Sequence, residues 1–201
     1  MERRDALKNL GLSIGGITMS STVVGLLQSC SGKSNLTWNP EIFDSQEAEL
    51  ITKTLEVILP RTDDMPGATE LNLTQFIDGY IKHVSGTEEQ KSIKKLAEKY
   101  LSTTKSTLGK KNVSDMTLDD IDSRLAYYLK ADKSQIDQWS NEDSDDASNY
   151  NFLNSLRSRG VSAFKMSEYI GEKVLAYSPI PGQQIGCVDL NEATGGKAWS
   201  I

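Results

Sequence analysis

Few residues in this 201-residue chain could perform catalysis or bind a metal. It contains 1 His and 2 Cys, which are too few for the usual zinc site built from Cys and His ligands. His83 has no second His and no reactive-Cys motif to serve, so the sequence offers no base paired with a nucleophile. The acidic pairs at 63–64 and 119–120 are better explained as helix caps and loop charges than as acid–base partners. The residue types indicate a scaffold or a binding partner rather than a catalyst.

Charge and composition exclude several other classes of protein. The chain has 22 Lys and Arg against 28 Asp and Glu, which gives a net charge of -6 and argues against nucleic-acid binding. No Gly-rich phosphate loop follows an expected strand, so the sequence predicts no dinucleotide cofactor on this chain. Only one uncharged stretch, residues 9–29, approaches the length of a membrane span, which excludes a polytopic membrane protein.

The N-terminus has the layout of an export signal. Two arginines, Arg3 and Arg4, precede the weakly hydrophobic residues 9–29. Paired arginines before a weak hydrophobic stretch resemble a twin-arginine signal, which directs the export of folded proteins. The alternative is a general secretory signal that happens to contain two arginines. Residues 1–29 are therefore predicted to be a signal peptide.

The signal ends in a sequence that resembles a bacterial lipobox. Leu27 stands three residues before Cys30, and the small residue Ser29 stands directly before it. The resemblance implies that Cys30 becomes the lipidated first residue of the mature chain, on the periplasmic side of a bacterial membrane. Several acyl chains on one residue would give lasting attachment. An accidental Cys after a signal is the alternative. Lipidated Cys30 cannot pair, so Cys187 would be a free thiol or would bond another chain.

The elements that would position these residues are helices. Residues 30–43 are polar and turn-forming, which predicts a lipidated tether, and residues 44–201 are predicted to form one domain. From residue 44 on, apolar residues recur at helical spacing, and no alternation typical of a strand is sustained. The fold class is therefore all-α: a single compact multi-helix domain with an irregular Pro/Gly-rich C-terminal tail.

Local signals predict where several helices begin and which faces they bury. Capping boxes pair Asp44 with Glu47 and Thr117 with Asp120. Residues 73–84 are expected to form a helix with one apolar face, made of Phe76, Ile77, Tyr80, Ile81 and Val84. The acidic run 141–149 contains no large apolar residue and is predicted to be a solvated loop, with a cation site as the alternative. Helical pieces are expected around 150–159 and 167–176.

Three segments of the chain resemble the gluconate 2-dehydrogenase subunit 3 family. The first is an opening helix with the turn that follows it, the second contains a Pro-Gly turn, and the third leads into a Pro-rich strip. In order, the segments are 43–50 with 57–63, 65–70 with 76–78, and 163–168 with 174–182 and 186–187. Together the resemblance covers most of residues 43–190.

The resemblance implies a partner rather than an activity for this chain. Members of the family accompany a large FAD-dependent dehydrogenase of the glucose-methanol-choline type, which oxidises sugars or sugar acids. FAD and catalysis belong to that large subunit, and a cytochrome c subunit can complete the assembly. The small chain would be non-catalytic, and its signal would export the folded flavoprotein. The alternative function is a stand-alone envelope lipoprotein that binds a carbohydrate or a protein partner. An independent enzyme is disfavoured, because nucleophile, metal ligands and cofactor loop are missing.

Two motif loops are the candidate partner-binding residues. Pro66 and Gly67 indicate a tight turn in which Gly67 can take a positive φ. Tyr177 is an aromatic residue with a polar tip, of the type enriched at interfaces. The remaining candidates flank it, at the start of the third segment and along the stiffened strip: Ser167, Glu168, Pro179, Pro181 and Gly182. The alternative is that both loops only cap the helices of their own domain.

Overall fold

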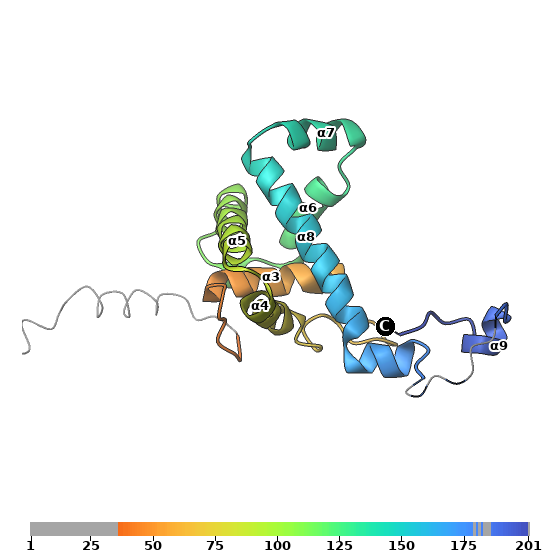
Figure 1. Cartoon of the computed structure of the whole chain (residues 1–201). Coiled ribbons are helices and arrows are strands. Elements are labelled where there is room, and N and C mark those ends of the chain that lie inside the picture. The colour runs from red at the N-terminus through yellow and green to blue at the C-terminus, as the bar shows by residue number, and fades with distance from the viewer. Residues whose placement is uncertain (1–35, 179, 181, 183–185, 201) are drawn as a thin grey trace, which may run out of the picture. The chain divides into compact units, whose positions relative to one another are not determined.

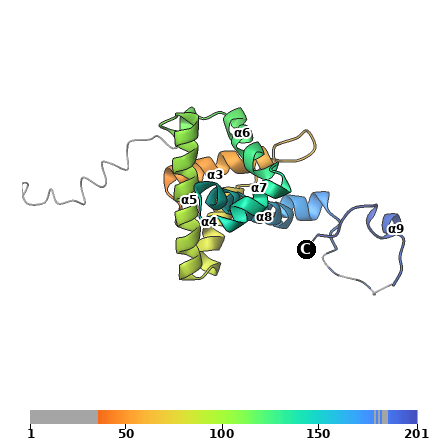
Figure 2. The same cartoon turned by 90° about the horizontal axis from the view of Figure 1, so that it is seen from above.

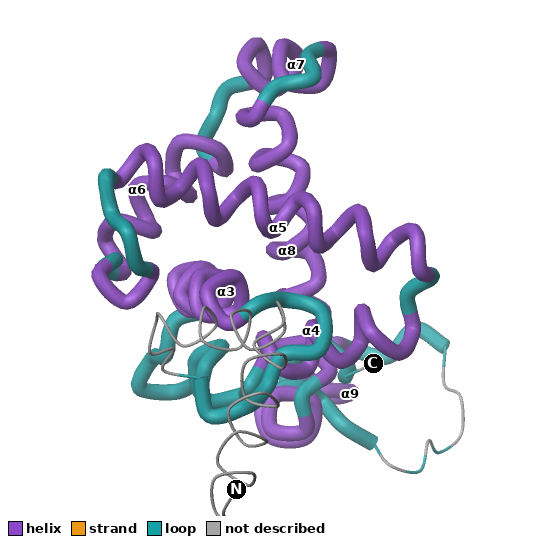
Figure 3. The backbone as a smooth tube through the Cα atoms, turned by 90° about the vertical axis from the view of Figure 1, so that its left-hand side faces the viewer, coloured by secondary structure: helices purple, strands orange, loops and turns teal. Residues whose placement is uncertain are grey.

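The computed structural model describes residues 36–178, 180, 182 and 186–200. The predictions for Arg3, Arg4, Cys30, Pro179 and Pro181 lie outside these residues. Within them the all-α prediction is confirmed: the chain is helical, and its strand-like contact is one isolated bridge (Figure 3). No helix in the described part is long and apolar enough to cross a membrane.

From α4 to α8 the helices follow one another through short connections, whereas longer segments join α3 to α4 and η2 to α9 (Figure 1). Their bounds are α3 Ser45–Ile58, α4 Leu73–Val84, α5 Thr87–Leu108, the 3-10 turn η1 Val113–Asp115, α6 Leu118–Leu129, α7 Lys133–Asn141, α8 Asp145–Met166, the π-helical turn η2 Ile170–Val174, and α9 Leu190–Thr194. Helix α3 is central, since it contacts α4, α5, α6 and α8 (Figure 2). Leu55 of α3 and Leu153 of α8 are completely buried in the resulting core.

Both predicted capping boxes are present. The Asp44 carboxylate accepts the Glu47 N–H over 2.8 Å, and the Glu47 carboxylate accepts the Asp44 N–H over 2.8 Å. Thr117 and Asp120 exchange the same two bonds at the start of α6. These bonds satisfy N–H groups that a helix start otherwise leaves unpaired, so the local sequence defines both starts.

The buried face of α4 differs from the predicted one. Ile77 and Ile81 are buried, but Phe76, Tyr80 and Val84 are exposed. The helix is turned toward its polar residue Asp78, which is buried because its carboxylate accepts the backbone N–H groups of residues 41–43 over 2.7–3.1 Å. Satisfying these backbone donors outweighed burying the whole apolar face.

The acidic run 141–149 was predicted to be a loop, but part of it is helical. Helix α8 begins within it, with Ser144 as the N-cap and Asp145 and Asp146 in the first turn. Negative side chains are favourable at this end of a helix because they interact with its positive dipole end. A run without a large apolar residue therefore begins a helix through capping and charge.

The segment after α8 also differs from the sequence prediction. Helix α8 runs without interruption to Met166, and the expected helix 167–176 is reduced to the π-helical turn η2. Beyond it the tail residues that the structure describes are irregular, apart from the short helix α9 between its N-cap Asp189 and the left-handed Gly195. The isolated bridge joins Ala176 to Trp199, so the end of the chain returns to the segment that follows η2.

Candidate functional site

Pro66 and Gly67 lie in the loop that joins α3 to α4. The loop is closed by its own backbone and hydroxyl groups: the Thr62 N–H donates to the Met65 carbonyl over 2.9 Å, and the Met65 N–H donates to the Thr62 hydroxyl over 3.1 Å. Pro66 follows this closed turn directly. The closed turn therefore spans residues 62–65 and does not include the Pro-Gly pair, where the sequence predicted it.

Glu56, near the end of α3, holds the second half of this loop. Its carboxylate accepts the Thr69 N–H over 2.9 Å and the Thr69 hydroxyl over 2.6 Å, and it accepts the Arg61 N–H over 3.4 Å. The prediction that Gly67 takes a positive φ is wrong. Glycine is required for a different reason: a Cβ there would lie 2.6 Å from Glu56 Oε1 and 2.7 Å from the Arg61 nitrogen. The loop backbone is thus bound to its own domain.

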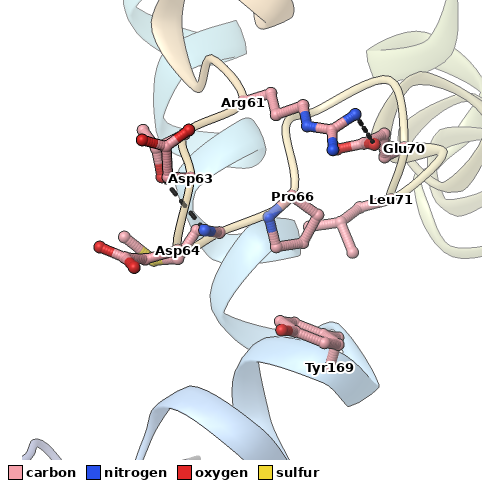
Figure 4. A pocket seen from close by; sticks show the side chains of 9 residues that line it. Arg61, Asp63, Asp64, Pro66, Glu70, Leu71 and Tyr169 are labelled. Carbon is pink, nitrogen blue, oxygen red and sulfur yellow. Dashed lines mark hydrogen bonds and ion pairs between the residues drawn. The ribbon is translucent and has the colours of Figure 1, made fainter.

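A hollow of about 370 Å³ opens beside the loop (Figure 4). One side carries the Arg61–Glu70 ion pair, whose nitrogen and oxygen are 3.0 Å apart. Pro66 and the exposed carboxylates of residues 63–64 form the rim. Tyr169, from the segment after α8, lies across from Pro66. The structure therefore brings the Pro-Gly loop and the third motif segment together, although a hundred residues separate them in the sequence.

Ser167 and Glu168, the next predicted site residues, have different environments. Ser167 ends α8, and its hydroxyl donates to the Phe164 carbonyl over 2.7 Å. Its own carbonyl accepts the Gly171 N–H over 2.8 Å, which starts the η2 turn. Glu168 is exposed. Ser167 thus has a structural role that positions its neighbours, while Glu168 and Tyr169 remain available to a partner. Single π-helical turns such as η2 are rare and are frequent at functional sites.

A second, apolar hollow of about 370 Å³ lies between α4 and the end of α8. Phe76, Tyr80 and Met166 supply its apolar lining, and each is about half-exposed. Arg159 lies at its edge and pairs with Glu89 over 2.7 Å. These apolar residues were assigned no binding role from the sequence. No signal in the sequence separates them from the buried residues of the same apolar face, whose width is ordinary for an amphipathic helix.

Tyr177 stands at the start of the tail and is 50% exposed. The preceding residue, Ala176, is paired with the end of the chain: its N–H donates to the Ala198 carbonyl over 2.8 Å, and its carbonyl accepts the Ser200 N–H over 2.8 Å. Trp199 is 56% exposed within this pairing. Two large aromatic residues thus lie close to one another in the chain fold without being buried by their own domain.

Several of the tail residues that the structure describes are open to solvent. Ile180 is 83% exposed, and a Cβ added at Gly182 would contact nothing within 4 Å. Cys187 is exposed and forms no disulfide with any residue that the structure describes. Over the same residues, no group of three or more His, Cys, Asp or Glu side chains is arranged to hold a metal ion.

Comparison with known protein families identifies the family of this chain. The family model described as gluconate 2-dehydrogenase subunit 3 matches residues 45–182, which is more than half of the chain. The matched region runs from the first turn of α3 to the tail and includes both hollows. Comparison with the curated proteins and with the solved structures gives no match.

Proposed function

Because the chain belongs to the gluconate 2-dehydrogenase subunit 3 family, and is thus an accessory subunit of a dehydrogenase complex, we propose that it is the non-catalytic small subunit of a periplasmic FAD-dependent enzyme. The large partner subunit, of the glucose-methanol-choline type, binds FAD and oxidises a sugar or a sugar acid. A cytochrome c subunit is a further candidate partner. The family match over residues 45–182 is the observation that carries this proposal.

The distribution of exposed apolar side chains supports a partner-binding role. Most of the large apolar residues that are exposed belong to α4, the α3–α4 loop, or the chain from the end of α8 onward; these are Met65, Phe76, Tyr80, Val84, Met166, Tyr169, Tyr177, Ile180, Val188, Leu190 and Trp199. Single exposed apolar residues are ordinary, but such residues gathered on a few connected segments are typical of interfaces. We assign the large subunit to this surface.

In this proposal, the signal peptide exports the flavoprotein together with the small chain. A flavoprotein that binds FAD in the cytoplasm must cross the membrane already folded, and a twin-arginine signal serves folded cargo. One signal on a tightly bound small subunit then suffices for both chains. Lipid on Cys30 would hold the exported complex at the periplasmic side of the membrane.

Purification of the chain from membranes tests the proposal. An affinity-tagged chain should bring with it a much larger polypeptide and the yellow absorbance of FAD, in equimolar amounts. A matched preparation of a variant that carries charge on the proposed surface, Phe76→Asp with Tyr80→Asp, should lose both. A colourless single chain from the unaltered protein would contradict the proposal and favour the stand-alone envelope lipoprotein.

A further inference from the structure

Residues 36–43, which precede α3, lie along α4 and are called the strap here (Figure 1). At the end of the strap, the N–H groups of residues 41–43 donate to the Asp78 carboxylate of α4 over 2.7–3.1 Å. At its beginning, Leu36 and Trp38 pack against the hydrophobic core and line a hollow together with the first turn of α4. This part of the predicted tether 30–43 is therefore bound to the folded domain.

Asp78 and the strap depend on each other. Asp78 is only 1% exposed, and a buried carboxylate needs hydrogen-bond donors in place of water. The three N–H groups of residues 41–43 supply them, and these groups would themselves lose their partner without Asp78. Phe43, the last residue of the strap, is buried in the core. The strap is thus fastened both by charge-assisted hydrogen bonds and by apolar packing.

The strap leaves only a short connection to the proposed lipid on Cys30. Six residue steps separate Cys30 from Leu36, so at about 3.3–3.6 Å per residue Leu36 lies at most about 20 Å from Cys30. A tether that ran freely from Cys30 to Asp44 would reach about 50 Å. The shorter reach is less than the length of helix α5 alone, which is about 33 Å. The strap side of the domain is therefore the side held near the bilayer.

The surface beside the strap has the chemistry to lie against lipid headgroups. The hollow there has a volume of about 140 Å³, and its described lining residues are apolar or neutral polar, with no charged residue among them. Both hollows described above include charged residues. Acidic groups at this surface would have to be desolvated and would be repelled by anionic lipids, and a neutral surface avoids both costs. Trp38 adds an amphipathic ring of the type that is enriched at membrane interfaces.

The single charged residue of the strap, Glu41, is kept away from this neutral surface. Its Oε1 lies 3.6 Å from Nε2 of His83, near the end of α4. The hollow instead adjoins the first turn of α4, where Thr74 lines it. Nine residues, or about 14 Å along the helix axis, separate Thr74 from His83. The strap thus places its charge and its neutral residues at opposite ends of α4.

The apolar hollow of the proposed partner surface lies on the other side of α4. Residues two apart in a helix point in nearly opposite directions, about 160° from each other. Asp78 points to the strap, whereas Phe76 and Tyr80, two residues before and after it, line the apolar hollow. A domain held by its strap side therefore turns the apolar hollow away from the bilayer.

We propose that the strap holds the domain with its neutral surface around Leu36 and Trp38 against the lipid headgroups of the bilayer. The large subunit then binds on the side of α4 that is turned away from the membrane. This inference rests on the proposed function, because it requires lipid on Cys30. It adds the orientation of the small subunit, which the accessory role alone does not specify.

Quenching by a headgroup-labelled lipid tests this orientation. The full-length lipidated chain, in its purified complex, is reconstituted into vesicles of phosphatidylethanolamine and phosphatidylglycerol that contain a lipid with a nitroxide headgroup. In a Cys187→Ser background, a fluorophore is attached either to Gln75→Cys at the neutral surface or to Ser140→Cys on α7 (Figure 1). Both positions are exposed. We expect the label at position 75 to lose most of its fluorescence and the label at position 140 to keep nearly all of it.

Two changes that lengthen the tether test the role of the strap. Asp78→Ala removes the acceptor of residues 41–43 and should reduce quenching at position 75 to the level at position 140. Asp122→Ala, at an exposed Asp of α6, is the matched control and should leave quenching unchanged. Insertion of about twenty Gly and Ser residues after residue 34 adds roughly 25 Å of flexible chain, does not alter the domain, and should act like Asp78→Ala. Circular dichroism shows whether each variant is folded, and the insertion decides if Asp78→Ala is not.

Equal quenching at the two labelled positions, or stronger quenching at position 140, would overturn the orientation. Quenching at position 75 that persists after the insertion would overturn the role of the strap. Mass spectrometry of Cys30 and the absorbance of co-purified FAD separate this inference from the proposed function. An unlipidated Cys30 would refute anchoring and orientation together. A lipidated chain that brings the flavoprotein with it but shows no difference in quenching would refute the orientation alone.

Discussion

Gly67 shows how a single missing side chain fixes the α3–α4 loop. The loop passes so close to Glu56 and Arg61 that there is no room for a Cβ at this position. Glu56 can bind Thr69 only because of this approach, so one glycine secures several hydrogen bonds of the loop. The same need cannot be recognised from the sequence, where a Pro-Gly pair indicates a turn with positive φ.

Gly67→Ala should destabilise the protein by about 1–3 kcal/mol, because the clash with the Arg61 backbone forces the loop to shift. The matched control is Gly79→Ala in α4, where an added Cβ would contact nothing within 4 Å. That change should stabilise the protein by about 0.5–1 kcal/mol, since alanine is the better helix former. Urea unfolding measures both. Equal effects of the two substitutions would show that close approach is not the reason for glycine at position 67.

Glu49 gives the stability of the domain a pH dependence. It is buried in α3 with one carboxylate oxygen unpaired within the described residues. Burial raises the pKa of this carboxyl, only partly offset by the positive charge of Lys53. The folded state therefore favours the protonated form of Glu49. This group stabilises the fold fully below the ordinary pKa of a Glu carboxyl, and that contribution is lost as pH rises through the raised pKa of the folded state.

Glu49→Gln should raise the free energy of unfolding at pH 7, because a neutral amide removes the cost of burying a charged carboxylate, and should change it little at pH 4, where the carboxyl is largely protonated. Denaturant unfolding at the two pH values checks this. Glu47→Gln is the contrasting variant, because Glu47 also has a raised pKa but accepts the Asp44 N–H and binds Lys94. A loss of stability at pH 7 in Glu49→Gln would contradict the assignment.

At the scale of elements, the sequence predicts helix starts better than helix faces. The capping boxes at Asp44 and Thr117 are local, since donor and acceptor are three residues apart, and both were predicted correctly. The face that α4 buries depends on Asp78 binding residues 41–43, which are more than thirty residues away. No local periodicity contains that information, so the exposed row of Phe76, Tyr80 and Val84 could not be predicted.

The candidate site, too, was only partly predictable from the sequence. The motif segments identified Pro66, Gly67 and Tyr177, but not what each does: Gly67 permits a close approach, and Tyr177 stands half-exposed beside a paired chain end. Tyr169 lies opposite Pro66 only because α8 carries it across the domain. Such pairings arise from tertiary packing and are absent from any single segment.

Tyr177→Ala should weaken binding of the large subunit about 30-fold, because truncating a buried interfacial aromatic costs ~2 kcal/mol or more. The free small chain should keep its helical content, since Tyr177 is half-exposed in the isolated domain. Affinity and circular dichroism are the two measurements. Leu118→Ala, at a similarly exposed apolar residue on α6, is the control and should leave affinity unchanged. Unchanged affinity in Tyr177→Ala would place this residue outside the interface.

At the scale of the whole molecule, the domain presents two unlike surfaces at the two ends of α8. The Met166 end carries apolar groups suited to a protein partner, and the Asp145 end carries a polar hollow of about 450 Å³. On α8 the lining residues of the two hollows come nearest at Asn149 and Ser158, which are nine residues or about 14 Å apart along the helix axis, so the two surfaces share no lining residue.

Arg3→Lys with Arg4→Lys should strand both this chain and its flavoprotein in the cytoplasm, because the twin-arginine pathway reads the arginine pair. Cell fractionation with flavin fluorescence measures the distribution of the complex. Cys30→Ala is the matched control: it should remove lipid labelling and leave an uncleaved precursor, while export of the flavoprotein continues. Flavoprotein that still reached the periplasm in the double-lysine variant would refute the escort role.

The pairing of Ala176 with Ala198 and Ser200 closes residues 177–197 into a ring held by two backbone hydrogen bonds. After a protease cuts within this ring, the C-terminal peptide is held to the helical domain only by these two hydrogen bonds and by few other contacts among the described residues. Limited digestion of the free chain should therefore detach a short C-terminal peptide and leave the helical domain intact. Large-subunit binding over Tyr177 should slow that cut, which makes the rate of nicking a simple measure of how much of the ring the partner covers.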